Sequence, residues 1–328
     1  MKILIIGGGG FIGQKLAKKL AATNLINGQA ISKIILADIS KPGTIIGAVP
    51  MEYKTIDVSN KVDVEGLFVD NPDIVFHLAA IVSGEAEQNF DAGMRTNLGG
   101  SMNILDVAAR KSATTGNIPI IVFASSAAVH GGEAPDVIVD GVELNPQTSY
   151  GTQKAVTELL LQDYSRKGFV DGRGLRLPTV SIRPGKANTA ASSFISSIFR
   201  DTLQGDYSNC PVNKNYLVWH TAPRTVVNNL IHAATIPANK FGFNRNLNLP
   251  GRTDSIGEMI DQMTSVAGPG AAQRITWEKD PIIEQIVTGW RGRLEPKKAL
   301  SLGFTADRSF ADSVRYFLED DIAGDQTP

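Results

Sequence analysis

The chain has 328 residues, enough for one large domain or two closely associated ones. This length excludes a small module that needs disulfide bonds or a metal ion to fold. Its 32 basic residues balance 33 acidic ones, so a grip on nucleic acid or anionic lipid is not expected. Its one cysteine, Cys210, cannot form an internal disulfide, and we expect a reducing, cytoplasmic compartment. Glycine is abundant, with 32 residues, four of them consecutive at positions 7–10.

The first residues are an apolar run followed at once by glycines. The run Ile3–Ile6 is far shorter than the core of a secretory signal, so we expect this segment to be structural. No uncharged stretch approaches the roughly 18–20 apolar residues of a membrane helix, and we expect no membrane partner.

Short apolar runs rich in β-branched residues recur along the first half of the chain. They are nearly continuous rather than alternating, which is typical of strands buried on both faces of a parallel sheet. The runs are residues 2–7, 33–38, 53–58, 73–80, 118–126 and 179–185.

Helical patterns lie between several of these runs. Apolar side chains spaced by three or four predict buried helix faces. The positions are Ile12, Leu16 and Leu20, then Met94, Leu98, Met102 and Leu105. Strands that alternate with helices predict an α/β fold, a Rossmann doubly wound parallel sheet, with ligands at the carboxyl ends of its strands.

The pattern loosens after about residue 185. We expect residues 1–185 to form a Rossmann domain with the catalytic residues, and 186–328 to form a smaller C-terminal α/β substrate domain. Residues around 216–250 are candidates to return to the Rossmann sheet. Helices are predicted near 191–203, 224–235, 255–266 and 309–322.

A glycine-rich turn joins the first predicted strand to the first predicted helix. Gly7, Gly10 and Gly13 have the spacing that permits a tight turn, a close approach of the backbone to a pyrophosphate, and close helix packing. The second strand ends in Asp38, whose carboxylate would accept ribose hydroxyls and repel a 2′-phosphate, which favours NAD over NADP. Asp57 could meet the adenine edge or simply cap a loop.

A serine, a tyrosine and a lysine form a second constellation. Ser126 ends the fifth apolar run, and Tyr150 and Lys154 share one face of a predicted helix. A tyrosine has a reference pKa near 10, but an adjacent ammonium favours the phenolate. Tyr150 could then take a substrate hydroxyl proton, with Ser126 orienting the hydroxyl, while a hydride leaves the same carbon for a nicotinamide.

These motifs, together with the HLAA segment at 77–80, resemble the extended short-chain dehydrogenase/reductase superfamily along nearly the whole chain. The resemblance implies a seven-stranded Rossmann sheet, a small substrate domain and a homodimer built on two helices per subunit. It assigns catalysis to Ser126, Tyr150 and Lys154, with Asn97 as a water-mediated fourth member of the proton relay. It also implies further cofactor contacts, at Phe11 and Ile12 beside Gly10, at Val58 beside Asp57, and at Leu78, Ala79 and Ala80.

Three stretches, residues 83–97, 149–194 and 219–224, resemble more narrowly the D-erythronate dehydrogenase family. That resemblance implies NAD-dependent oxidation of the C2 hydroxyl of a four-carbon sugar acid, D-erythronate or L-threonate. Superfamily members that act on nucleotide sugars usually carry an arginine before a segment with paired acids. The corresponding segment here, residues 216–230, has neither feature.

A small hydroxy acid needs a cationic or amide-rich clamp for its carboxylate. The candidates, besides Ser126 and Tyr150, are Ser83, Lys186, Asn188 and Arg224. Arg183 fits a structural role better. The four histidines show no metal-ligand spacing, so we expect no metal. Two other functions stay open, a nucleotide-sugar epimerase or dehydratase that retains NAD, and a non-catalytic NAD-sensing Rossmann protein.

Overall fold

The computed structural model describes residues 1–186, 192–281, 283, 287 and 289–323. The chain divides into two compact units. Unit 1 comprises Met1–Val129, Thr148–Arg176 and Val227–Leu247, and unit 2 comprises His130–Gln147, Leu177–Val226 and Asn248–Pro328. The chain therefore passes between the units several times, whereas the sequence predicts a boundary at residue 185 with a return of residues around 216–250. Asn188 lies outside the described residues.

The centre of unit 1 is a seven-stranded sheet in the order β13-β9-β7-β6-β1-β4-β5. Parallel pairing joins β1 to β4 and to β6, β4 to β5, and β6 to β7, which confirms the Rossmann-like α/β fold. The strands are β1 Lys2–Ile6, β4 Lys33–Asp38, β5 Met51–Thr55, β6 Ile74–His77, β7 Ile120–Ser126, β9 Asp171–Leu177 and β13 Asn246–Asn248. Of the stretch 216–250, residues 246–248 enter this sheet.

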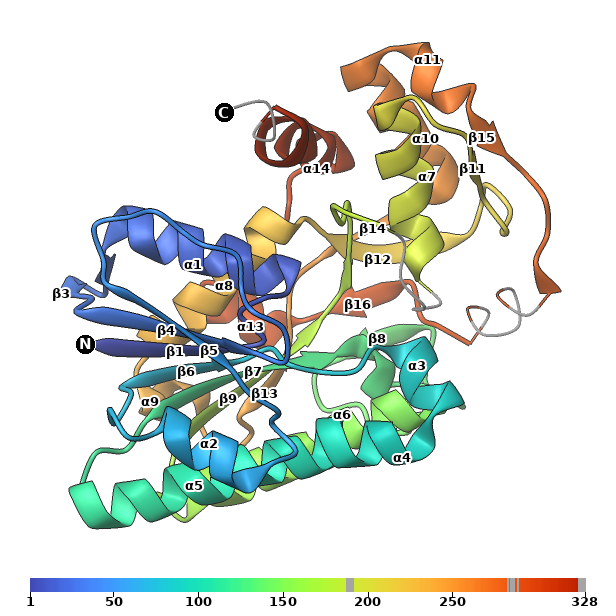
Figure 1. Cartoon of the computed structure of the whole chain (residues 1–328). Helices are drawn as coiled ribbons and strands as arrows, with labels where there is room; N and C mark the ends of the chain where they lie inside the picture. The colour runs from blue at the N-terminus through green and yellow to red at the C-terminus, as the bar shows by residue number, and fades with distance from the viewer. Residues whose placement is uncertain (187–191, 282, 284–286, 288, 324–328) are drawn as a thin grey trace. The chain divides into compact units, whose positions relative to one another are not determined.

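Helices cover both faces of the sheet (Figure 1). Leu4 and Ile6 of β1 belong to a buried cluster with residues of α2 Lys61–Leu67, α5 Gly100–Thr115 and α6 Ser149–Arg166. The helices α1 Phe11–Thr23 and α8 Pro223–Thr235 lie along the other face. Shorter elements of unit 1 are β2 Leu25–Ile26, β3 Gln29–Ala30, α3 Ser83–Gln88, α4 Phe90–Gly93, η1 Met94–Gly99, η2 Ala127–Val129 and α9 Ala238–Phe241.

The helical face predicted through Met102 is wrong at that residue. The segment η1 Met94–Gly99 is a π-helix inserted between α4 and α5. A π turn holds more residues than an α turn and shifts the phase of the side chains that follow. Met102 is consequently 50% exposed, while the neighbouring Leu105 is buried.

The sixth strand of the sheet is β9, and the prediction of residues 179–185 for that place is wrong. Within that run, Thr179–Val180 forms β10 of a different sheet. The sequence of β9, DGRGLRL, carries two buried arginines and two glycines and so has no apolar run. Arg173 pairs with Asp171, and Arg176 pairs with Glu158, which makes the burial of both guanidinium groups tolerable.

Unit 2 contains a three-stranded sheet in the order β10-β12-β14, where β12 is Leu217–Thr221 and β14 is Arg252–Ser255. Its apolar core collects residues of α7 Ser193–Gln204, α10 Ile256–Ala267 and α14 Phe310–Phe317. Among the described residues of this unit, the other elements are β8 Val137–Val139, β11 Ser208–Asn209, α11 Pro269–Ala272, β15 Ile275–Thr276, β16 Arg293–Glu295, α13 Lys297–Ser301 and η3 Leu318–Ile322.

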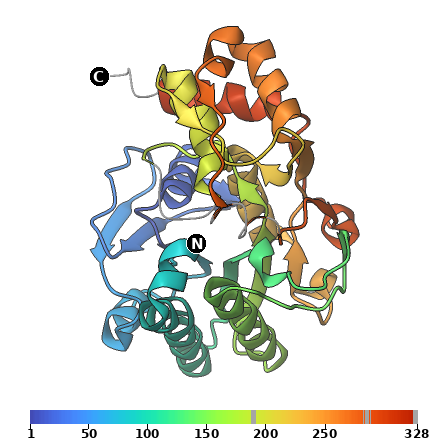
Figure 2. The ribbon, with the colours of Figure 1, turned by 90° about the vertical axis from the view of Figure 1, so that its right-hand side faces the viewer.

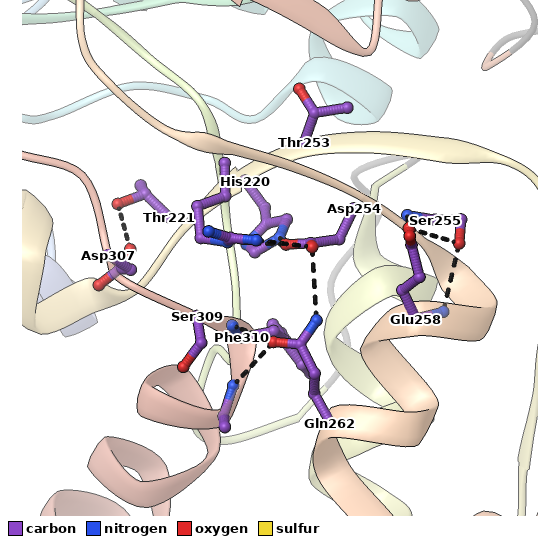
Figure 3. A network of polar contacts seen from close by, with 12 residues as sticks. His220, Thr221, Thr253, Asp254, Ser255, Glu258, Gln262, Asp307, Ser309 and Phe310 are labelled. Carbon is purple, nitrogen blue, oxygen red and sulfur yellow. Dashed lines mark hydrogen bonds and ion pairs between the residues drawn. The ribbon is translucent and has the colours of Figure 1, made fainter.

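A buried polar network ties the elements of unit 2 together (Figure 3). His220 of β12, fully buried, hydrogen-bonds through Nε2 to Asp254 Oδ2 at 2.8 Å. Gln262 of α10 donates to Asp254 at 3.3 Å and accepts the backbone N–H of Phe310 at 2.7 Å. The network therefore joins β12, β14 and α10 through side chains and reaches α14 through the backbone N–H of Phe310.

Candidate active site

The turn between β1 and α1 has the shape of a dinucleotide cradle. Gly7 has φ +89°, and a Cβ there would lie 2.6 Å from the backbone nitrogen of Ala79. A Cβ on Gly13 would collide with the Gly7 carbonyl. Both positions therefore require glycine. The N-cap of α1 is Gly10, with no side-chain cap, so the end of the helix presents backbone N–H groups and its partial positive charge.

Asp38, the last residue of β4, supports this turn directly. Its Oδ2 accepts the backbone N–H of Gly9 at 2.9 Å. On the opposite side, the backbone N–H groups of Leu78 and Ala79 both donate to the Ile6 carbonyl, at 2.8 and 3.0 Å. The loops after β4, β1 and β6 thus meet at the carboxyl ends of neighbouring strands, where a doubly wound sheet holds its ligand.

The loop after β5 holds Asp57 and Val58. Asp57 Oδ1 accepts the backbone N–H of Ser59 at 2.8 Å, so this carboxylate caps its own loop. Val58 is 6% exposed and packs against Gly100 of α5. An adenine contact at these two residues stays a prediction.

Lys154 is held in the second turn of α6 by the neighbouring strand. This helix begins with Thr148 as its N-cap, whose Oγ1 accepts the Gly151 N–H at 3.1 Å. Lys154 Nζ donates to the Ala124 carbonyl of β7 at 2.7 Å and lies 5.5 Å from the centroid of the Tyr150 ring. The lysine is only 3% exposed, and burial lowers its pKa to about 7, with the charge of Glu158 opposing that shift.

Ser126 is the last residue of β7, and its Oγ accepts the backbone N–H of Ala128 at 3.1 Å. The helix α6, which carries Tyr150 and Lys154, packs against β7 and against η2, the turn that follows Ser126. One strand end and one helix start therefore bring the three predicted catalytic residues to the same part of unit 1.

Asn97 lies in the π-helical segment η1 and is 4% exposed. Its Oδ1 accepts the Ile81 N–H at 2.8 Å, and its Nδ2 donates to the Ile81 carbonyl at 3.1 Å and to Gln153 Oε1 at 2.7 Å. The amide thus ties η1 to the loop after β6 and to α6. Its place in a water-mediated relay stays a prediction.

Two buried groups near Lys154 were not anticipated from the sequence. Glu158, on α6, is fully buried and bound by Arg176 and Ser125. His77, at the end of β6, hydrogen-bonds Ser101, and burial with the nearby charge of Lys154 lowers its pKa to about 3, so it is neutral. The spacing of Tyr150, Lys154 and Glu158 by four residues each was the available signal for Glu158.

The candidates for the substrate carboxylate fall in different places. Ser83 begins α3 in unit 1, whereas Lys186 and Arg224 belong to unit 2. Lys186 is exposed. Arg224 donates to Glu319 at 2.9 Å and to both oxygens of Asp320, and its guanidinium lies 4.1 Å from the centroid of the Tyr316 ring.

The bond to Asp320, opposed by partial burial and aided by Glu319, raises the pKa of Arg224. Its charge is thus matched by two carboxylates. Arg183 donates to the Val180 carbonyl at 2.9 Å and to Ser192 Oγ at 2.8 Å, as expected of a structural residue.

Comparison with known proteins identifies the family. Residues 3–228 match the family described as "NAD dependent epimerase/dehydratase family". The chain belongs to this family. Family membership implies a nicotinamide cofactor, which the glycine turn, the uncapped start of α1 and Asp38 fit.

Two full-length relatives are named D-erythronate dehydrogenase. The protein from Cupriavidus necator is 43% identical over 98% of both chains. The protein from Haemophilus influenzae is 41% identical over 98% of this chain and 100% of its own length. The crystal structure of a protein named nucleoside-diphosphate-sugar epimerase, from Agrobacterium tumefaciens, is 43% identical with a TM-score of 0.95, over 99% of this chain and 95% of its own.

Among the described residues, no group of three or more His, Cys, Asp and Glu side chains could hold a metal ion. Over the same residues, no helix has the length and apolar character that crossing a membrane requires.

Proposed function

We propose that this protein is an NAD-dependent dehydrogenase that oxidises the C2 hydroxyl of a four-carbon sugar acid, D-erythronate to 2-oxo-tetronate, with L-threonate as a second candidate substrate. The observation that carries the proposal is the 41–43% identity to two D-erythronate dehydrogenases over 98% of the chain. The positions of Ser126, Tyr150 and Lys154 support the chemistry.

Ser126, Tyr150 and Lys154 each have a separate role in the proposed oxidation. Ser126 orients the substrate hydroxyl, and Tyr150, as phenolate, accepts its proton. The Lys154 ammonium, 5.5 Å from the Tyr150 ring centroid, stabilises that phenolate. NAD, when bound, supplies the acceptor for the hydride that leaves C2. The proton goes to Tyr150, two electrons leave with the hydride, and a 2-oxo acid remains.

The choice of NAD over NADP rests on Asp38. Its carboxylate, anchored by the Gly9 N–H, ends the strand beside the glycine turn. A carboxylate there accepts ribose hydroxyls and repels a 2′-phosphate. We assign the pyrophosphate to Gly10, Phe11 and Ile12 at the start of α1.

Lys186 is the preferred cation for the substrate carboxylate, because the charge of Arg224 is already matched by Glu319 and Asp320. Replacing Lys186 by Met should raise KM for the sugar acid at least tenfold with little change in the KM for NAD. Arg224→Met serves as the comparison, and a larger rise there would reverse the assignment.

The direct test measures reduced nicotinamide during incubation with NAD and D-erythronate, L-threonate or related aldonic acids. Reduction with a four-carbon acid supports the proposal, and no reduction with any aldonic acid overturns it. The name of the Agrobacterium protein favours a second candidate, a nucleotide-sugar epimerase. Tightly retained NAD and turnover of a UDP- or dTDP-sugar would establish that activity instead.

We also propose a homodimer that associates through α5 and α6, which lie side by side in unit 1 (Figures 1 and 2). Each helix exposes a large apolar side chain, Met102 at 50% and Leu159 at 61%. Burial of such side chains against a second copy would remove apolar surface from water.

A further inference from the structure

One face of α6 carries three functional groups in register. Tyr150, Lys154 and Glu158 follow one another at intervals of four residues, which places them one above the other along the helix. Lys154 is 3% exposed and Glu158 is fully buried. A buried carboxylate one turn from a buried ammonium interacts with it far more strongly than a surface pair would.

The carboxylate of Glu158 is fixed by two strands. Oε1 accepts the Ser125 hydroxyl of β7 at 2.5 Å and Arg176 Nε of β9 at 3.0 Å. Oε2 accepts Arg176 Nη2 at 2.7 Å and Nε at 3.1 Å. These bonds cover both oxygens, so the carboxylate cannot turn away from its place beside Lys154.

We propose that Glu158 is a positioning residue that, held by Arg176, keeps the Lys154 ammonium charged beside Tyr150. The inference rests on the proposed roles of Tyr150 and Lys154 and adds the group that sustains them. The alternative is that Glu158 and Arg176 form a structural ion pair with no effect on Lys154.

The charged groups around Lys154 determine in which direction each substitution shifts its ionisation. On α6 itself are Tyr150 and Glu158, β9 supplies Arg176, and β6 supplies His77, which is neutral. The strand β7 contributes Ser125 and the Ala124 carbonyl, which carry no charge. Elements packed on the start of α6 carry exposed charges, Glu85 and Glu87 on α3, Asp91 on α4 and Arg95 on η1.

Removing Glu158 and removing Arg176 should therefore shift the ionisation of Lys154 in opposite directions. Without the Glu158 charge, burial of Lys154 is no longer opposed by a carboxylate one turn away and favours the neutral amine more strongly. Without Arg176, the carboxylate loses its own partner and favours the ammonium more strongly. If Glu158 and Arg176 only stabilise the fold, both variants should be less stable than the wild type. The ionisation of Lys154 should then stay unchanged or shift in the same direction in both variants.

The test is a pH titration of the full-length protein labelled with ¹³C at lysine Cε and observed by NMR, with the Lys154 signal assigned by its loss in Lys154→Arg. Glu158→Gln should lower the midpoint by about one pH unit, a tenfold change in the ratio of charged to neutral lysine. Arg176→Met should raise it. Ser125→Ala removes one hydrogen bond and no charge, while Arg176 still binds both oxygens of Glu158. This matched control should therefore leave the midpoint within a few tenths of a unit.

The same titration decides the inference when a variant does not fold. Circular dichroism identifies folded variants, and either charge variant alone suffices, because each has its own predicted direction. Opposite shifts support the inference. An unchanged midpoint, shifts in one direction, or a shift with Ser125→Ala equal to that of Glu158→Gln overturns it. If neither charge variant folds, a wild-type midpoint below neutrality overturns the inference and a midpoint at or above neutrality supports it.

The titration uses protein without substrate, so its result does not depend on which sugar acid is oxidised. Failure of the proposed function would leave the opposite shifts intact. Failure of the inference would leave the dehydrogenase assay unchanged. In a protein for which both hold, the falling limb of the pH profile of kcat/KM should move with the NMR midpoint.

Discussion

Lys154 donates a hydrogen bond from Nζ to the carbonyl of Ala124 at 2.7 Å, across the contact between α6 and β7. The ammonium is thereby placed before any ligand binds. A positively charged group held in a buried setting acts on a neighbouring phenol without reorganising at the moment of reaction, which is the property that electrostatic catalysis requires.

Tyr150→Phe removes the phenolic hydroxyl that we propose as the base and keeps the aromatic ring at the start of α6. We expect kcat for sugar-acid oxidation to fall by about 10²–10⁴-fold, the usual contribution of a general base. The Kd for NAD, measured by calorimetry, should change less than about threefold. Full activity in this variant would remove Tyr150 from the mechanism and strengthen the NAD-sensing alternative.

Asp38→Asn keeps the shape of the side chain and its bond from Gly9 but removes the negative charge. The ratio of kcat/KM for NAD to that for NADP should fall at least tenfold, because repulsion of the 2′-phosphate is lost. Asp57→Asn is the matched control, since Asp57 caps its own loop. An equal change in both variants would contradict the assignment to Asp38.

Leu159→Arg places a charge on the exposed face of α6, where Leu159 is 61% exposed. If α6 forms the proposed dimer interface, sedimentation should show a monomer for this variant and a dimer for the wild type. Leu25→Arg, at a position 47% exposed on β2, should leave the dimer intact. Dissociation by both variants would point away from a specific α6 interface.

Asp254→Asn should destabilise unit 2 by about 3 kcal/mol, because the change leaves Arg252 and His220 without their carboxylate. Burial opposes the ionisation of Asp254, but the hydrogen bonds from His220 and Arg252 outweigh it and hold its pKa well below the usual range. A depressed pKa in the folded state stabilises the protein above pH ~4, and this contribution is lost as the pH falls through the folded value.

Urea unfolding at pH 7 and at lower pH would measure this contribution. The difference in unfolding free energy between wild type and Asp254→Asn should shrink as the pH falls below ~4. Asp163→Asn is the control, because both members of its ion pair with Arg166 are more than half exposed and such a pair contributes little. A difference that grows with acidity would contradict the prediction.

Sequence patterns predicted the parts of the fold in which the residue types of a segment match its place in the structure. The run at 33–38 forms β4 over the same residues, and the glycine turn follows β1 as expected. The predictions failed where charged side chains are buried in positions that apolar side chains usually take. The strand β9 contains Arg173 and Arg176, and α6 contains Glu158, which in sequence look like solvated residues.

Their burial depends on partners far along the chain that no local pattern reveals. Arg173 bonds to the Ala233 carbonyl, and Arg176 bonds to Glu158. The π segment at 94–99 had a similar effect on α5, because one wide turn displaced the predicted stripe at Met102. Buried ion pairs and irregular helix turns depend on the folded chain, so they could not be predicted from local sequence.

The strand β13, residues 246–248, closes the seven-stranded sheet beside β9 and comes from late in the chain. Asn246 donates to the Glu158 carbonyl at 3.2 Å, and a Cβ on Gly174 would collide with the Asn246 side chain. During synthesis on a ribosome, the first 185 residues would emerge with β9 as an open edge. The Rossmann sheet therefore needs the chain as far as residue 248, and a fragment cut at residue 185 would lack one of its two edge strands.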